Sequence, residues 1–418
     1  MTAQETRFNL TIQGPKLWGA STTGLIELDF DSAQDPRVSN THSYIPRLFN
    51  AMFRLNWPET ELMLGQYWTM FCEYGPEDAQ VAGLNNHGRL LARVPQIRLT
   101  QKFAGAWTVA AAILKPYDPA PADTNFANVT VNPGQVQAAS TGLEGQASET
   151  PHFDAKIAYE KDLWGKAAFF GRPRGFAAQV TGGWQRLRYR GNAVAAASNT
   201  FGENAYGTAN VIQGSQQFLN PWMVQANLFI PVLPTHTFNL AGTASLSVQW
   251  FIGQGLSAFG EAQDTDNSWF DFSGRRFDGA YIYDRRLTNQ FGGFIQGQYW
   301  FTNRWFINAV WGMQRSFGVD RSTTAQAISL NNPLGCHYAA PGTNDQVKLW
   351  QELDLTLWYR PIQALKFGLQ YSYGRTDYFQ KLNNPMAANL NVLGGQMSAG
   401  ATDFGEAHRV QFVAFMFF

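Results

Sequence analysis

Hydrophobic and polar residues alternate with a period of two along much of this chain. In residues 347–359 the odd positions are apolar apart from one glutamine: Val347, Leu349, Gln351, Leu353, Leu355, Leu357 and Tyr359. The even positions carry most of the polar groups: Lys348, Trp350, Glu352, Asp354, Thr356 and Trp358. In 46–57 one face holds Asn50, Arg54 and Asn56, and the apolar face holds Phe49, Ala51, Phe53, Leu55 and Trp57. Because successive side chains of a strand point to opposite faces, each segment predicts a strand with one apolar and one mixed face.

The last ten residues show this pattern most clearly. Counted back from the terminus in steps of two, one face is wholly apolar: Phe418, Met416, Ala414, Phe412 and Val410. The other face includes Gln411 and Arg409. An apolar face set against a mixed face over about ten residues suits a strand that crosses a membrane. A terminal strand that closes on phenylalanine also resembles the end of bacterial outer-membrane β-barrels.

Segments of this kind recur along the whole chain, and helical periodicity is hard to find. We expect fifteen strands, near 6–13, 18–30, 43–56, 60–71, 91–103, 106–116, 151–163, 176–190, 217–230, 237–252, 290–301, 305–316, 346–360, 365–378 and 406–418. Tight connectors such as Gly14-Pro15-Lys16 and Ala104-Gly105 alternate with long ones. Short periplasmic turns that alternate with long extracellular loops are typical of bacterial barrels.

The chain therefore predicts an all-β fold, a transmembrane antiparallel β-barrel, with residues 1–418 as a single domain. Its long extracellular loops include 117–150, 253–289, 317–345 and 379–405. A soluble β-sandwich also has amphipathic strands. The strands expected here are long, however, and their apolar faces are rich in aromatic residues, which favours the barrel.

The count of fifteen strands is odd. The last strand must run toward the periplasm, and alternation makes the strand at 6–13 run the same way, so the two edges would meet in parallel. Bacterial single-chain barrels have even strand numbers. We therefore expect that an upward strand belongs before Met1 and is missing from this chain, and that the full barrel has sixteen strands. A miscounted strand is the alternative.

Composition agrees with a membrane barrel. The chain has 31 Lys and Arg against 31 Asp and Glu, so no net charge favours a nucleic-acid partner. Charged residues make up only 15%, below the roughly 25% usual in soluble domains, whereas aromatic residues also reach 15%. No apolar run approaches the length that a transmembrane helix needs. A barrel places its aromatic residues in girdles at both membrane interfaces.

The start of the chain and its cysteines bear on compartment. Met1 to Asn9 has neither a basic n-region nor an apolar h-region, so we expect a mature or truncated form rather than one with a signal peptide. Cys72 and Cys336 both fall near the extracellular side, where oxidation is possible. A disulfide between them and two unrelated thiols are both open.

Catalytic chemistry is weak in this sequence. The six histidines show no metal-ligand spacing, and no Gly-x-Ser-x-Gly, phosphate loop or dinucleotide fingerprint is present. A barrel phospholipase would need Ser and His on its outer wall; His408 shares the lipid-facing parity but lacks a convincing Ser partner. We expect no enzyme, no cofactor and no metal site.

Several short motifs carry a resemblance to a known family. They are Pro46-Arg47-Leu48 with Asn56-Trp57, Leu64-Gly65-Gln66-Tyr67-Trp68-Thr69-Met70-Phe71, Arg7-Phe8-Asn9-Leu10, Ile26-Glu27-Leu28-Asp29-Phe30 and Pro95-Gln96-Ile97-Arg98-Leu99-Thr100-Gln101. Together they resemble the DcaP-like porins over the first 115 residues or so, and more loosely over the C-terminal strand. The resemblance implies a sixteen-stranded trimeric channel and passive uptake of small anions such as dicarboxylates or aromatic acids. In that family a strand precedes the Arg-Phe segment, in agreement with the parity argument.

The alternation also places charged residues on the lumen face. The basic candidates for lining the pore and binding solute are Arg7, Arg54, Arg98, Lys102, Lys348 and Arg409. A charge in a narrow wet pore acts on passing ions through a focused field. We expect Arg54 and Arg98, which we place on neighbouring strands, to be the best anion contacts, because a guanidinium fork suits a carboxylate. The alternative is that these charges pair with lumen carboxylates such as Glu352 and Asp354 and only keep the wall hydrated.

The connector 117–150 is the leading candidate for the constriction of the pore. It carries Asp118, Asp123, Glu144 and Glu149 and no Lys or Arg. Folded inward opposite a basic wall, it would set up a transverse field across the pore. Long connectors are either functional or disordered. Because 132–149 is rich in Gly, Gln, Ser and Ala, a floppy surface loop is the alternative.

These features predict an outer-membrane porin for passive diffusion of small hydrophilic, anionic solutes. The expected location is the bacterial outer membrane, with a homotrimer in contact with membrane lipid and lipopolysaccharide and with no nucleic-acid partner. The alternative is a barrel plugged by its own loops that serves as a structural protein, adhesin or partner-binding protein.

Overall fold

The computed structural model describes residues 6–30, 46–79, 90, 92–116, 150–195, 211–259, 269–275, 280–319, 322–323, 347–378 and 404–416. Almost all of this is β-strand, in one nineteen-stranded sheet and a separate two-stranded sheet. Two short 3₁₀ helices, η1 (Met70–Cys72) and η3 (Leu256–Phe259), interrupt the strands. In the part of the chain so described, no helix is long and apolar enough to cross a membrane.

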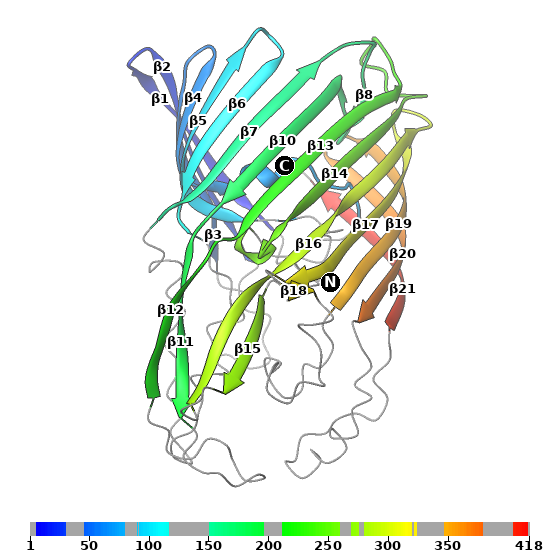
Figure 1. Ribbon diagram of the computed structural model, residues 1–418. Coiled ribbons are helices and arrows are strands. Elements are labelled where there is room, and N and C mark those ends of the chain that lie inside the picture. The colour runs from blue at the N-terminus through cyan, green and yellow to red at the C-terminus, as the bar shows by residue number, and fades with distance from the viewer. Residues whose placement is uncertain are drawn as a thin grey trace.

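Fifteen of the strands form a continuous wall in which each strand is antiparallel to the next (Figure 1). In wall order they are β1 (Phe8–Leu17), β2 (Ala20–Asp29), β3 (Arg47–Asn56), β4 (Thr60–Trp68), β5 (Arg93–Phe103), β6 (Trp107–Leu114), β7 (His152–Lys161), β10 (Phe176–Trp184), β13 (Trp222–Leu233), β14 (Ala244–Gln254), β16 (Ala280–Trp300), β17 (Trp305–Val319), β19 (Val347–Ile362), β20 (Leu365–Tyr378) and β21 (Phe404–Met416). The predicted all-β barrel wall of fifteen strands is confirmed.

The remaining strands lie outside this wall. Four of them extend the sheet beyond the wall, on the side away from the short turns: β11 (Leu187–Ala195), β12 (Val211–Leu219), β15 (Trp269–Arg275) and β18 (Ser322–Thr323). The other two, β8 (Ala167–Phe169) and β9 (Arg172–Arg174), pair only with each other. The expected loop 253–289 therefore contains β15 and the first part of β16, which begins at Ala280 rather than near 290.

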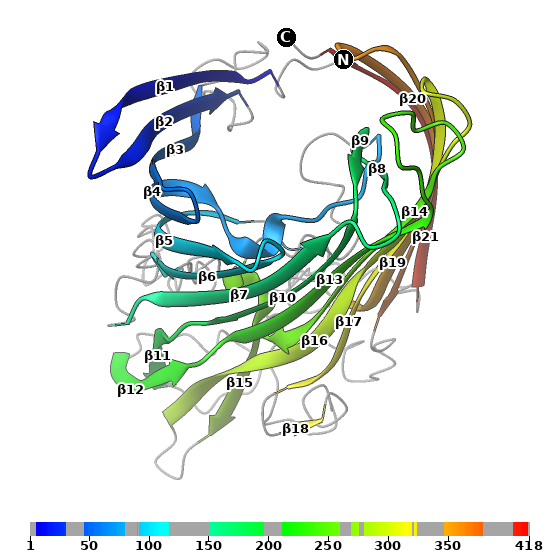
Figure 2. The ribbon, with the colours of Figure 1, turned by 90° about the horizontal axis from the view of Figure 1, so that it is seen from above.

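The two edges of the wall are β1 and β21. Seen along the barrel axis, the sheet curls round so that these edge strands come back toward each other (Figure 2). They run in the same direction. Each strand of the wall is antiparallel to the next, and the steps from the first to the fifteenth strand make an even number of reversals. Within the described ranges no ladder joins them. The sixteenth strand stays a prediction.

Two of the short turns place two successive residues at positive φ: Trp18-Gly19 (φ 50° and 79°) and Ala104-Gly105 (φ 51° and 65°). Leu17 pairs with Ala20, so the first is a two-residue hairpin; type I′ hairpins require this conformation, and glycine adopts it without a steric penalty. Phe103 pairs with Trp107, so the second loop has three residues. The first turn corrects the sequence-based expectation, which placed it at Gly14-Pro15-Lys16. The ladder instead continues past an irregularity to Leu17. Proline is tolerated there because β1 is an edge strand.

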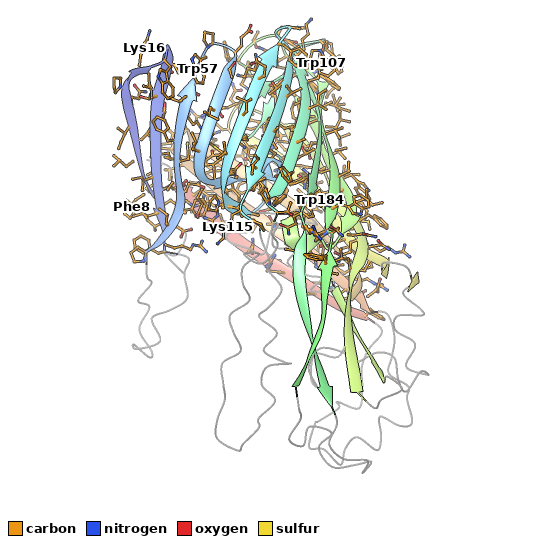
Figure 3. All side chains as sticks on the ribbon, turned by 60° about the vertical axis from the view of Figure 1, so that its left-hand side comes forward. Phe8, Lys16, Trp57, Trp107, Lys115 and Trp184 are labelled. Carbon is orange, nitrogen blue, oxygen red and sulfur yellow. The ribbon has the colours of Figure 1, made fainter. Side chains whose placement is uncertain are left out.

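The two faces of the wall differ as a membrane barrel requires. On β19 the outward Leu355 and Leu357 are 43% and 41% exposed, whereas Asp354 and Thr356 point inward and are fully buried. Buried inward residues elsewhere on the wall include Gln179, Gln225, Asn227, Gln249, Gln296, Gln298, Asn308 and Gln370. Aromatic side chains mark both ends: Figure 3 shows Trp57 and Trp107 near the short turns, and Phe8 and Trp184 at the opposite end. An apolar outer band, aromatic girdles and a polar interior characterise transmembrane β-barrels.

Candidate functional site in the lumen

A stretch of chain after β4 enters the barrel and crosses its interior. We call residues 69–79 the inward segment. It begins with η1, where Thr69 N donates to Ala92 O at 3.0 Å. Inward-facing glutamines then hold its backbone: Gln225 Nε2 donates to Phe71 O at 3.0 Å, and Gln179 Nε2 donates to Met70 O at 3.4 Å. These contacts place the start of the inward segment against the lumen face of β10 and β13.

Aromatic packing fixes the root of the inward segment. Phe71 is fully buried in a cluster with Met223, Phe251 and Phe259. The rings of Phe71 and Phe259 meet edge to face at 5.8 Å. Burying an aromatic side chain of this size stabilises a structure by about 2 to 3 kcal/mol. The inward segment is therefore held by apolar packing at its start as well as by hydrogen bonds.

Glu77 anchors the far end of the inward segment to the opposite wall. Its carboxylate accepts hydrogen bonds from Lys366 Nζ at 3.0 Å and from Gln298 Nε2 at 2.9 Å. Its backbone N–H donates to Gln296 Oε1 at 2.6 Å, and its carbonyl accepts from Asn308 Nδ2. The glutamate is only 6% exposed. A buried carboxylate needs such partners, and three strands of the wall (β16, β17 and β20) supply them.

A second inward element lies at the short-turn end of the barrel, in the connector between β7 and β10. We call residues 166–175 the inward hairpin; it contains β8 and β9, joined by Phe170-Gly171 at positive φ (49° and 72°). Ser245 Oγ of the wall donates to Ala168 O at 3.0 Å. Arg174 pairs with Glu160 at 2.8 Å and lies 4.4 Å over the ring of Phe169.

The inward segment and the inward hairpin touch through aromatic rings. The rings of Tyr74 and Phe169 are 5.8 Å apart, and the Arg174 guanidinium lies 4.9 Å over the Tyr74 ring. Burial raises the pKa of the Tyr74 phenol to about 12, although nearby Arg174 opposes the rise. Tyr74 is therefore neutral at physiological pH and acts here as a packing residue with a polar tip.

These two inward elements and the turn between β19 and β20 line an open cavity of about 940 Å³. Four cationic side chains and one carboxylate line it: Arg172, Arg174, Arg360, Lys366 and Glu77. Phe169, Phe170 and Pro173 supply its apolar lining. We call this space the turn-side cavity. Its excess of positive charge makes it a candidate site for anions.

The predicted anion contacts Arg54 and Arg98 lie on the far side of the lumen. We expected them on neighbouring strands, but β4 lies between β3 and β5. Met63 of β4 is in register with both arginines. Both guanidinium groups approach the Tyr67 ring, at 5.0 and 5.7 Å. Arg54 Nη1 is 3.7 Å from Glu61 Oε2, and Arg98 Nη2 donates to Met63 Sδ at 3.4 Å.

Arg7 lies farther along the same wall, toward the long loops, and stacks 3.9 Å from the ring centre of Phe49. Arg93 covers the same ring at 3.6 Å. The sequence pattern put Phe49 on the lipid face, but this side chain is 3% exposed, and both arginines lie over its ring. The reason is an irregularity in the β2–β3 ladder, where Phe49 is an extra residue between partners. A β-bulge of this kind reverses the facing of the residues beside it.

The other predicted site residues have varied surroundings. Lys102 is exposed near the short-turn end of β5. Arg409 Nη2 lies 3.4 Å from Glu352 Oε1, so this cation has a carboxylate partner. Lys348 lies in β19, but its side chain is outside the described part of the structure, as is Cys336. Sγ of Cys72 is 3.3 Å from Thr69 Oγ1. The acidic candidates for the constriction also lie outside the described residues: Asp118, Asp123, Glu144 and Glu149.

Sequence reasoning missed Glu77, Arg172 and Arg360 as candidate site residues. The expected strands leave residues 72–90 and 164–175 as connectors, and the strand pattern does not indicate that either enters the barrel. One available signal was the length of 164–175, which far exceeds a two-residue turn and contains Arg172-Pro173-Arg174 between two glycines. Among the described side chains, no three His, Cys, Asp or Glu residues gather so as to hold a metal ion.

No protein-family model matches the chain, and no curated protein matches it in sequence. The crystal structure of the outer membrane channel DcaP of Acinetobacter baumannii is similar, with a TM-score of 0.56 and 15% identity over 100% of this chain and 86% of that chain. OmpT of Vibrio cholerae without loop L8 has a TM-score of 0.46, with 10% identity over 98% of this chain and 91% of that chain. The high-pH structure of OprB of Pseudomonas putida has a TM-score of 0.45, with 11% identity over 88% of this chain and 82% of that chain.

The similarity to DcaP confirms the expected resemblance at the level of the fold. The chain is an outer-membrane β-barrel, as the outward apolar band and the inward polar wall require. The two weaker similarities add nothing to this conclusion.

Proposed function

We propose that this outer-membrane β-barrel is a porin that lets small hydrophilic anions diffuse across the membrane, and that it works as a homotrimer. The observation that carries the proposal is the basic lumen face of β3 and β5. Arg54 has one weak carboxylate contact, to Glu61, and Arg98 has no ion pair among the described residues. Each buried Nε atom of this pair also has no hydrogen-bond partner there. Arg54 is partly exposed, so its guanidinium can meet a passing solute, whereas Arg98 is 8% exposed and acts on the solute through its field.

The surroundings of these arginines suit transient binding rather than tight binding. The Tyr67 ring lies beside both guanidinium groups, and this contact orients the charges without neutralising them. A fork of N–H donors then matches the two oxygens of a carboxylate. In a water-filled pore with low-dielectric walls, such charges raise the local concentration of anions. Carboxylates with one or two charges, of the dicarboxylate or aromatic-acid type, are the solutes we propose.

The competing function is a barrel closed by its own inward segment. The anchoring of Glu77 on three strands favours this alternative, because it holds the inward segment firmly across the interior. However, the wall strands that it bonds are β7, β10, β13, β16, β17 and β20. Arg54 and Arg98 lie on β3 and β5, which are not among these strands. We therefore favour an inward segment that narrows the lumen and steers solutes past the arginines.

Swelling of proteoliposomes tests the proposal. We expect faster swelling in a small dicarboxylate such as succinate than in a diamine of similar length such as putrescine. Replacing both arginines, in R54Q/R98Q, should remove most of this difference. R304Q is the matched control, because Arg304 is exposed in the turn between β16 and β17, away from the lumen arginines. Folded protein that gives no swelling in either solute would refute the channel, and equal rates in both would refute the anion preference.

A further inference from the structure

We propose that the turn-side cavity is a second anion site, which binds organic molecules that carry two negative charges. This inference rests on the proposed function, since it places the site on the path by which anions leave the lumen. Four cations line the cavity, but two of them are already engaged. Arg174 pairs with Glu160 at 2.8 Å, and Lys366 pairs with Glu77 at 3.0 Å.

The other two cations, Arg172 and Arg360, supply the uncompensated charge. Neither forms an ion pair in the described part of the chain. Arg172 is exposed on β9 and lines the cavity, and Arg360, near the end of β19, lines it as well. Two guanidinium groups that line one cavity suit a ligand with two anionic groups, or one dianionic group.

Local structure holds Arg360 in place before any ligand binds. Its Nη2 donates to Gln363 O at 3.3 Å. Its Nη1 lies against the tip of the inward hairpin, so close to Gly171 that a Cβ atom there would be 2.1 Å away. The buried Nε atom has no hydrogen-bond partner among the described residues. A cation fixed on two sides loses little conformational entropy when it binds an anion.

The rest of the lining identifies the ligand as organic. Phe170 is 45% exposed and borders the cavity with Phe169 and Pro173. A hydrated inorganic ion gains nothing from such surfaces, whereas a flat apolar body between two anionic groups would cover them. The volume of about 940 Å³ lies within the range of small-molecule sites. The shared chemistry is therefore a dianion on a flat apolar scaffold, either an aromatic dicarboxylate or an aryl phosphate.

Calorimetric titration of the folded, detergent-solubilised full chain tests this site, with terephthalate, phenyl phosphate and inorganic phosphate as probes. We expect at least one of the two aromatic dianions to bind at least tenfold more tightly than inorganic phosphate, and the tighter one identifies the source of the charge. R172Q/R360Q should weaken that binding at least tenfold. F170A should weaken the aromatic probe and leave inorganic phosphate unchanged. K16Q removes an exposed cation of β1 at the same end of the barrel, outside the cavity lining, and should bind as the unaltered protein does.

Equal affinity for inorganic phosphate and both aromatic dianions would overturn the proposal, and so would wild-type binding by R172Q/R360Q. Because Arg172 is exposed, R172Q alone keeps the test valid if the double variant fails to fold; it should weaken binding at least threefold. The titration does not require conduction. A channel that swells liposomes with anion preference but does not bind these probes would refute only this site.

Discussion

Removing the Glu77 carboxylate is expected to release the far end of the inward segment. In E77A, Lys366 Nζ and Gln298 Nε2 both lose the acceptor that they contact at 3.0 and 2.9 Å. The backbone contacts of Glu77 with Gln296 and Asn308 remain available. The inward segment would then rely on its aromatic root at Phe71 and on these backbone bonds.

The contacts of Lys366 set the size of this effect. A hydrogen bond to a charged group contributes about 1.5 to 3 kcal/mol, and removing one partner of a buried pair costs about 3 to 5 kcal/mol. Lys366 keeps part of its stabilisation, because its Nζ lies 4.0 Å over the Trp358 ring and 5.1 Å from the Phe415 ring. The ammonium also borders the turn-side cavity, where water screens it. We therefore expect docking to lose about 3 kcal/mol, roughly a 150-fold shift toward the released state.

Single-channel recording in planar bilayers measures the consequence. E77A should show a larger and noisier conductance than the unaltered protein, and E77Q should fall between the two because an amide oxygen still accepts hydrogen bonds. E59A is the matched control: it removes an exposed carboxylate in the turn between β3 and β4, and its conductance should be unchanged. A folded E77A channel with unaltered conductance and noise would show that the inward segment does not narrow the pore.

Three further predictions concern the same two inward elements. Gly171→Ala should lower the temperature at which the barrel loses its heat-resistant migration in gels, because a Cβ there would meet the Arg360 guanidinium at 2.1 Å. Gly242→Ala is the control: Gly242 has a positive φ but nothing within 4 Å, so this variant should lower the temperature less. Equal shifts in the two variants would refute the contact. Gln370→Leu removes the acceptor that the inward segment reaches with a backbone N–H at 2.6 Å, so its docking should weaken by about 1 to 3 kcal/mol, measured as increased current noise; unchanged noise would contradict this. Burial raises the pKa of Tyr74 to about 12, so the contribution of this side chain to stability is complete below about pH 10 and is lost as the pH rises toward 12. Tyr74→Phe should abolish that alkaline loss of stability in a thermal-denaturation series. An unchanged loss in this variant would contradict the role of Tyr74.

The strands of the wall could be predicted from the sequence because lipid imposes a rule that every strand must obey. Outward residues such as Leu355 must be apolar, and inward residues such as Asp354 face water or protein, so a period of two persists. The rule fails at Phe49, where an extra residue in β3 reverses the facing locally. A bulge of this kind depends on how two strands pair, and the composition of one strand does not reveal it.

The inward elements could not be predicted in this way because the contacts that hold them are remote in sequence. Glu77 and Lys366 are 289 residues apart, and nothing near Glu77 in sequence indicates whether the chain turns into the barrel or away from it. The alternation did indicate that Arg54 and Arg98 share the lumen face, because both lie on strands. Arg172 lies in a connector that has no such period, so its position depends on how the inward hairpin packs.

The reversal potential of the channel tests the anion preference most directly. It is measured across a planar bilayer that separates KCl solutions of roughly tenfold different concentration. The unaltered protein should reverse on the side of the chloride equilibrium potential, and R54Q/R98Q should reverse closer to zero. A reversal potential on the potassium side for the unaltered protein would contradict the proposal that the arginines of β3 and β5 select anions.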